Sequence, residues 1–435
     1  MDDLTLSGIA LGMLIVLMLL RVPVAVALGG VSFVGLWVML GPGTAWGILT
    51  TVPYDFISHW TLSSVPMFLL MGYICFHSQL TDGLFRVARA WLSWMPGGLA
   101  VASVGAAAGF SAVTGSSLAC AAAMGRIATP EMLRSGYDKG LASGTVAVAG
   151  TIGSMIPPSI LLLVYGIYAE QPISKLFIAG VLPGLLTALL YALMIVVRVK
   201  LNPKLAPAAA EKVTWRDRFD SFRGTWPVIA LIVGVFGGLF GGIFTPTEAG
   251  GIGSFLAFVI GFAQRALTLE KIKNAIMETL VTTGAIFIIA IGAILLTRFL
   301  ALSGFTAFIA EVVIEGEVSQ VALVLGTMAV LLFLGCFLDP IGIMLLTLPV
   351  FLPAVEGLHV NLIWYGILLT KLLEIGLIPP PVGLNVFVVK GIVGNTIPIE
   401  TIFKGVLWFL VADLICVGLL VAFPQISLFL PSLLK

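Results

Sequence analysis

Charged side chains are scarce in this sequence. Asp, Glu, Lys and Arg make up 10% of the 435 residues, whereas hydrophobic residues make up 60%. A soluble domain typically carries about 25% charged residues, so this chain has too little polar surface to cover a particle in water. Its solvent must be lipid. The formal net charge is +1 and the basic residues are spread over short loops, which argues against nucleic acid as a partner.

Cysteine and histidine are also rare. The four cysteines lie far apart in apolar sequence, without CxxC spacing, so we predict small core residues: Cys75, Cys120, Cys336 and Cys416. None of the three histidines has a Ser, Cys or Asp at catalytic spacing, and the HExxH motif is absent. An intramembrane enzyme would need a nucleophile with a partner base. We therefore predict that the chain is not an enzyme and needs no cofactor, with a channel as an alternative that large ion currents would reveal.

Long apolar runs dominate the chain. A membrane span needs about 20 apolar residues, and we assign ten apolar runs as spans: 4–20, 22–40, 65–78, 141–168, 174–197, 226–244, 246–264, 276–299, 360–390 and 404–430. Asp2 and Asp3 stand where a signal peptide would carry Lys or Arg, so we expect the first span to be retained. The sequence thus predicts an all-α polytopic membrane protein.

Basic loops predict the orientation. Between Arg198 and Arg223 lie seven Lys or Arg and only three acids, which the positive-inside rule places in the cytoplasm. Glu311, Glu315 and Glu317 form an acidic segment without a base and are expected outside. Counting spans back from the basic loop leaves the N-terminus outside.

Two further apolar segments do not fit as simple spans. Residues 98–129 have basic flanks and a centre rich in Ser and Gly, and residues 318–355 are interrupted by Asp339-Pro340. We predict re-entrant helical hairpins, the first entered from the cytoplasm and the second from outside.

Each predicted hairpin precedes a proline-broken span. Gly153 to Ser159 (GSMIPPS) recurs in outline as Gly376 to Pro381 (GLIPPP). The order in each half is span, hairpin, broken span, span, and the two halves have opposite orientation. This is an inverted repeat, as found in many secondary transporters. The sequence predicts a first repeat at 1–200, with its broken helix at 141–168, and a second repeat at 226–435, with its broken helix at 360–390. A basic linker, 201–225, joins them.

The proline pairs have two explanations. They can simply kink helices, which membrane helices tolerate. Alternatively, because each pair removes backbone donors, it frees carbonyls at mid-membrane depth, and such carbonyls with Ser or Thr hydroxyls suit a hard cation. The matched positions favour the second explanation, a Na⁺ site in each half.

At these residues the chain resembles the large membrane subunit of tripartite ATP-independent periplasmic (TRAP) transporters. The resemblance covers nearly the whole chain and rests on five motifs: Gly109 to Ser117 (GFSAVTGSS), Ile156 to Ser159 (IPPS), Thr245 to Gly250 (TPTEAG), Phe337 to Pro340 (FLDP) and Ile378 to Gly383 (IPPPVG). It implies an elevator-type ion-transporter fold, Na⁺ coupling and organic-acid import. It also implies two partners, a small four-helix membrane subunit and a periplasmic substrate-binding protein.

By position, the resemblance also implies site residues. The first Na⁺ site would use Ser111, Thr114, Gly115, Ser116, Gly150, Gly153 and Pro157. The second would use Cys336, Asp339, Pro340, Gly376 and Pro379. Substrate would lie between the hairpin tips, where helix N-termini offer free N–H groups to a carboxylate, lined by Ser117, Ser154, Ser159 and Asn385.

Several alternatives stay open. Lys371 and Glu374, one helical turn apart, are either functional intramembrane charges or a structural pair. Asp339 either ligates a cation or caps a helix, and Glu248 fits a structural role in a first helical turn. The rival function is a stand-alone Na⁺/dicarboxylate carrier of related inverted-repeat fold, which would need no binding protein.

Overall fold

The computed structural model describes residues 3–207 and 213–433, and in these ranges the chain forms helices and no strands. The prediction of an all-α protein is confirmed. The first four helices are α1 (Asp3–Leu19), α2 (Val24–Leu40), α3 (Pro42–Ile57) and α4 (Ser64–His77). The sequence does not predict α3, because Gly, Thr and Pro residues interrupt its apolar character.

Long helices of the second half pack around these early helices. Both α13 (Pro246–Ala263) and α14 (Leu269–Leu302) lie against α4, α14 also lies against α2, and α12 (Trp226–Phe240) packs on α13. Helix α13 begins with a capping box, in which Glu248 N–H donates to Thr245 Oγ1 (3.3 Å) and Thr245 N–H donates to Glu248 Oε2 (2.8 Å). The predicted structural role of Glu248 is confirmed.

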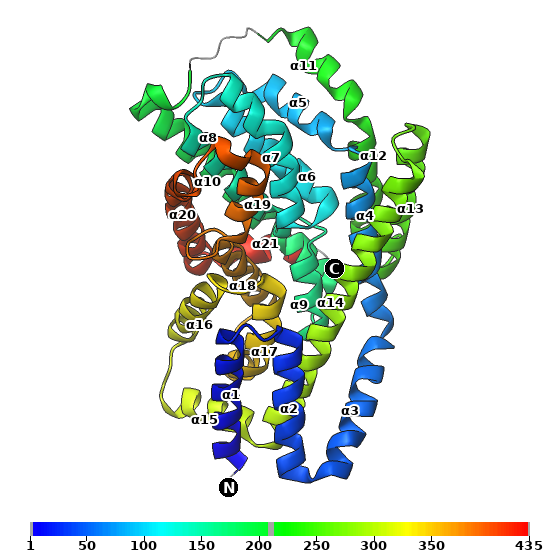
Figure 1. Ribbon diagram of the computed structural model, residues 1–435, viewed down its shortest axis with the longest axis vertical. Coiled ribbons are helices and arrows are strands. Elements are labelled where there is room, and N and C mark those ends of the chain that lie inside the picture. Colours follow the sequence, from blue (N-terminus) through cyan, green and yellow to red (C-terminus); the bar gives the residue numbers. More distant parts are fainter. Residues whose placement is uncertain (1–2, 208–212, 434–435) are drawn as a thin grey trace.

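Two helical hairpins occupy the segments in which the sequence predicts them. The first consists of α6 (Gly98–Thr114) and α7 (Ser117–Arg134). The second consists of α16 (Gln320–Gly335) and α17 (Pro340–Gly357). In Figure 1 the tip of each hairpin points towards the middle of the molecule, and the two hairpins approach it from opposite ends.

An interrupted helix follows each hairpin. The first consists of α8 (Lys139–Ala149), the short 3-10 helix η2 (Gly150–Ser154) and α9 (Ile160–Tyr168). The second consists of α18 (Leu362–Gly376) and α19 (Leu384–Val393). We refer to residues 150–159 as the first break and to residues 376–383, which begin with the last residue of α18, as the second break. Each break contains two consecutive prolines joined by a cis peptide bond.

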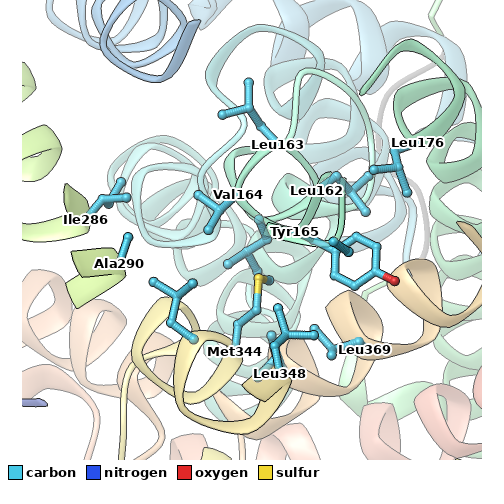
Figure 2. Close-up of a cluster of buried hydrophobic side chains, with 14 of the residues drawn as sticks. Leu162, Leu163, Val164, Tyr165, Leu176, Ile286, Ala290, Met344, Leu348 and Leu369 are labelled. Atoms are coloured by element: carbon cyan, nitrogen blue, oxygen red, sulfur yellow. The ribbon is translucent and has the colours of Figure 1, made fainter. Parts of the chain in front are cut away.

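Helix α9 joins the two halves in one core. Figure 2 shows Leu162 and Tyr165 of α9 in one cluster with Met344 of α17 and Leu369 of α18, and all four side chains are buried. The Tyr165 hydroxyl donates to the carbonyl of Leu362 at 2.6 Å, at the start of α18. Packing of α9 therefore positions the second break relative to the first.

Six described helices are long and apolar enough to cross a membrane, or seven if α11 (Trp215–Ser221) and α12 count as one bent span. The six are α4 with the turn before it (Trp60–His77), α10 (Ile173–Leu201), α13, α14, α17 and α20 (Ile399–Ala422). This confirms a multi-pass membrane protein. Five of the six lie in the ten predicted runs, and the sixth, α17, lies in the second predicted hairpin. Of the other five runs, three correspond to the shorter helices α1, α2 and α12, and two are interrupted by the breaks.

The predicted run 404–430 is wrong as a single helix. Helix α20 ends at Ala422, and the chain turns at Phe423-Pro424 into α21 (Gln425–Leu433), which packs back onto α10. Proline lacks the N–H that would continue the helical hydrogen bonds, so Pro424 accounts for the end of α20.

The charged segments that predict the orientation lie at opposite ends of the molecule. Figure 1 places α5 (Asp82–Leu92) and α11, which carry several arginines, at one end. The start of α1 lies at the other end with α15 (Phe305–Glu315), which carries two glutamates. Residues 208–212 of the predicted linker and Asp2 lie outside the described residues.

Candidate functional site

The first hairpin tip packs directly on the first break. Gly115, in the left-handed region at φ 61°, lies so close that a Cβ atom on it would be 1.9 Å from the carbonyl oxygen of Pro158. A Cβ on Gly153 would lie 2.9 Å from the carbonyl oxygen of Ser116, and one on Gly150 would lie 2.8 Å from that of Ser117. The residues predicted for the first Na⁺ site are thus brought together from two separate segments.

Three hydroxyls near this tip form local hydrogen bonds. Ser111 donates to the carbonyl of Ala107 (2.6 Å), and Thr114 donates to that of Phe110 (3.2 Å). Ser116 caps α7 by accepting the N–H of Ala119 (3.4 Å). A hydroxyl that donates its proton keeps its oxygen lone pairs, so Ser111 and Thr114 remain able to accept a cation.

The second hairpin and the second break also meet through glycine. A Cβ on Gly335, the last residue of α16, would lie 2.7 Å from Gly376 Cα. Cys336 directly follows Gly335, so it is close to this contact, and its thiol donates to the carbonyl of Leu332 at 3.3 Å. Asp339 caps α17, its Oδ2 accepting the N–H of Gly342 at 2.8 Å, with Pro340 in the first helical position. This bears out the capping role and leaves the other carboxylate oxygen for a cation.

The two tips differ in exposure. Gly115 and Pro157 are buried, whereas Asp339 is exposed and Pro379 is partly exposed. The first tip is therefore enclosed by protein, whereas the second reaches the surface of the chain.

Serines of the first half meet a carboxylate of the second half between the tips. Ser117 Oγ donates to Glu374 Oε1 at 2.6 Å and lies 2.9 Å from Ser154 Oγ. All three side chains are buried. Two residues predicted to line the substrate thus share a hydrogen-bond network with Glu374.

The other two residues predicted to line the substrate differ from this pair. Ser159 is buried, and its side chain caps α9 by accepting the N–H of Leu162 at 3.1 Å. Asn385 is fully buried in α19, and neither its amide oxygen nor its amide nitrogen has a hydrogen-bond partner in the described part of the chain. Buried amide groups nearly always have a hydrogen-bond partner, so the side chain of Asn385 is a good candidate to bind a polar ligand.

Lys371 forms its ion pair with Asp413 of α20, so the proposed structural pair of Lys371 with Glu374 is wrong. Lys371 Nζ and Tyr191 Oη both lie 2.5 Å from Asp413 Oδ1, and Tyr191 Oη is 3.1 Å from Thr151 Oγ1 in η2. Lys371 and Asp413 are fully buried. The network links the first break to α10, α18 and α20.

Sequence reasoning misses Asp413 and Tyr191. Asp413 is the single charged residue between Lys404 and the end of α20, and an isolated acid in an apolar run implies a buried partner. That signal was available in the sequence. Its pairing with Lys371 depends on which faces of α18 and α20 meet, which the sequence alone does not reveal.

The fold resembles that of solved membrane transporters. The YdaH transporter of Alcanivorax borkumensis superimposes with a TM-score of 0.63 over 88% of this chain and 90% of that chain, at 14% identity, so the likeness concerns the fold alone. With its matched hairpins, broken helices and buried charges, the chain is a polytopic membrane transport protein. A family model described as "Tripartite ATP-independent periplasmic transporter, DctM component" matches residues 11–426, and the chain belongs to this family.

Two relatives illustrate the match. The chain is 35% identical over 381 residues to the C4-dicarboxylate TRAP transporter large permease protein DctM of Pseudomonas aeruginosa, covering 87% of this chain and 88% of that protein. It is 31% identical over 395 residues to the sialic acid TRAP transporter permease protein SiaT of Haemophilus influenzae, covering 90% of this chain but 63% of SiaT. The family confirms that the chain is a large permease subunit and not an enzyme.

Proposed function

We propose that this chain is the translocating subunit of a Na⁺-coupled, binding-protein-dependent transporter that imports an organic acid by an elevator mechanism. The observation that carries the proposal is the paired contact of each hairpin tip with its own break, Gly115 with Pro158 and Gly335 with Gly376. Two such contacts in matching positions favour paired ion sites over incidental kinks. Na⁺ serves as the coupling ion, and no other cofactor is required.

The two Na⁺ sites use the residues assigned by position. In the first, Ser111, Thr114 and carbonyls of the tip face the glycines of the first break. In the second, the free oxygen of Asp339 and carbonyls near Cys336 face Gly376. Oxygen ligands of this kind suit a hard cation.

The substrate is an organic acid of the carboxylate or sialic-acid type, as the names of the two relatives suggest. It lies near Ser117, Ser154 and Asn385. The carboxyl group of Glu374 lies beside these serines, and in its ionised form it would repel an acid in this low-dielectric setting. Na⁺ bound at the tips offsets that charge, which gives a physical reason for cotransport.

Movement of the hairpins against α4 is the proposed elevator step. Gly72 of α4 lies so close to the first tip that a Cβ on it would be 2.9 Å from the carbonyl oxygen of Thr114. Small residues allow membrane helices to approach closely without interlocking side chains. The close backbone contact between α4 and the first hairpin tip therefore suits an interface at which the two can slide.

The proposed setting is the bacterial inner membrane with the N-terminus in the periplasm. Separation of the arginine-bearing and glutamate-bearing helices to opposite ends in Figure 1 supports this orientation. The partners are a small four-helix membrane subunit and a periplasmic substrate-binding protein, in keeping with the tripartite family.

Reconstitution tests the proposal. We expect uptake of C4-dicarboxylates or sialic acid into proteoliposomes only when this chain, the small subunit, the binding protein and a Na⁺ gradient are all present. Omitting each in turn should remove uptake. Full Na⁺-driven uptake by this chain alone would instead identify a stand-alone carrier, and uptake unaffected by Na⁺ would reject the coupling.

Asp339→Asn should separate the cation role of this residue from its capping role. Asn caps helices about as well as Asp, so the unfolding temperature should stay close to that of the wild type. Losing the carboxylate should raise the Na⁺ concentration for half-maximal uptake about tenfold, equivalent to roughly 1.4 kcal/mol. Asp138→Asn is the matched control, because Asp138 caps α8 in the same way at 2.9 Å. Equal Na⁺ dependence in both variants would leave Asp339 with capping alone.

A further inference from the structure

A groove separate from both hairpins lies between α10 and α20. It has a volume of about 500 Å³, and most of its lining is aliphatic, including Leu193, Val197 and Val411. These three side chains are 55%, 45% and 52% exposed, respectively. Since α10 and α20 are both candidate spans, these exposed apolar side chains are suited to contact lipid.

A basic group lies in the lining of this groove. The guanidinium of Arg198 lies 5.2 Å from the ring centre of Trp408, and both residues line the groove. Arg198 Nη1 is buried and has no hydrogen-bond partner within residues 3–207 and 213–433. Asp138, whose carboxylate acts on Arg198 electrostatically, forms no ion pair with it in these ranges, and Asp138 Oδ1 accepts the N–H of Leu141. An unpartnered guanidinium beside an aromatic ring is a ready site for an anionic oxygen.

We propose that the α10–α20 groove binds an anionic phospholipid, with one acyl chain along Leu193, Val197 and Val411 and the headgroup phosphate on Arg198. Charge complementarity favours this occupant, because the otherwise apolar lining of the groove includes the guanidinium of Arg198. Basic pockets between membrane helices are a recognised arrangement for anionic headgroups.

The size of the groove favours a lipid chain over a partner helix. A helix about 10 Å wide with a 5.4 Å pitch fills roughly 400 Å³ per turn. The groove therefore accepts about one turn, too little for a packed transmembrane helix.

The proposed lipid would brace the helices that hold the buried ion pair. Tyr191 lies two turns before Arg198 on α10, and Asp413 lies on α20 between the groove residues Val411 and Ile415. A lipid between these helices stabilises the folded chain by mass action. This consequence concerns stability and holds whether or not the chain couples transport to Na⁺.

Native mass spectrometry of the full chain, purified in detergent and stripped of lipid, tests the proposal with phosphatidylglycerol and phosphatidylcholine of identical chains. We expect phosphatidylglycerol to bind about tenfold more tightly and to raise the unfolding temperature more. Arg198→Ala should remove this preference, because a hydrogen bond to a charged group typically contributes about tenfold in affinity. Lys200→Ala is the matched control, since Lys200 is exposed and does not line the groove, and should leave the preference intact.

A second variant tests the groove itself. Val411→Trp should weaken binding of both lipids about tenfold without changing charge, and it keeps the test informative if Arg198→Ala folds poorly. Equal affinity of the wild type for the two lipids would overturn the proposal. So would protection by inorganic phosphate equal to that by phosphatidylglycerol, or a dimer of this chain that Val411→Trp abolishes, which would assign the groove to a second copy.

Discussion

Gly115→Ala is expected to reduce substrate uptake at least a hundredfold, equivalent to roughly 2.8 kcal/mol. The new methyl group would lie 1.9 Å from the carbonyl oxygen of Pro158, a backbone atom that cannot rotate away. Its φ of 61° adds strain, because a left-handed conformation costs an L-residue about 1–2 kcal/mol. The tip must separate from the first break, which disperses the oxygens proposed to bind Na⁺.

Gly284→Ala provides the control for this substitution. Gly284 is in α14, and a Cβ added there has no neighbouring atom within 4 Å. That variant should insert and transport like the wild type, in proteoliposomes containing both partners and matched for the amount of protein. Wild-type uptake by Gly115→Ala, with an unchanged Na⁺ requirement, would show that the tip contact is not needed for transport.

The parts of this site that the sequence predicts are those made by backbone. Gly115, Gly153 and Gly376 stand beside turns or prolines, and such residues mark interruptions whatever surrounds them. The positions of these glycines and prolines, together with the charges that flank the apolar runs, predict the hairpins and the breaks. Helix α3 is missed because its glycines and prolines, read in the same way, suggest a loop although the chain there is helical.

The parts that the sequence does not predict are side-chain pairings across distant segments. Ser117 and Glu374 belong to different halves, and no local pattern shows that α7 starts beside the end of α18. Lys371 and Glu374 are neighbours on one helix, so the sequence suggests that they pair with each other. In the fold each finds a closer partner on another element, because tertiary packing overrides the weak attraction available within a helix.

Lys371→Met is expected to lower the free energy of unfolding by about 3–5 kcal/mol, the usual effect of leaving one buried charge without its partner. Asp413 would keep the Tyr191 hydroxyl, but its carboxylate would lose the ammonium group at 2.5 Å in a fully buried setting. The unfolding temperature of the purified chain in detergent measures the effect. Lys200→Met, at an exposed position on α10, should leave that temperature close to the wild-type value.

The double variant Lys371→Met/Asp413→Leu decides what the pair is for. Replacing both charges by apolar groups removes the unpaired charge, and such replacements are often neutral or stabilising, so most of the lost stability should return. Uptake should return with it if the pair only holds α18 against α20. Recovered stability without recovered uptake would show that the positive charge of Lys371 acts in transport, where it balances Glu374 beside the serines of the first tip. Equal destabilisation in the single and double variants would contradict the buried pairing itself.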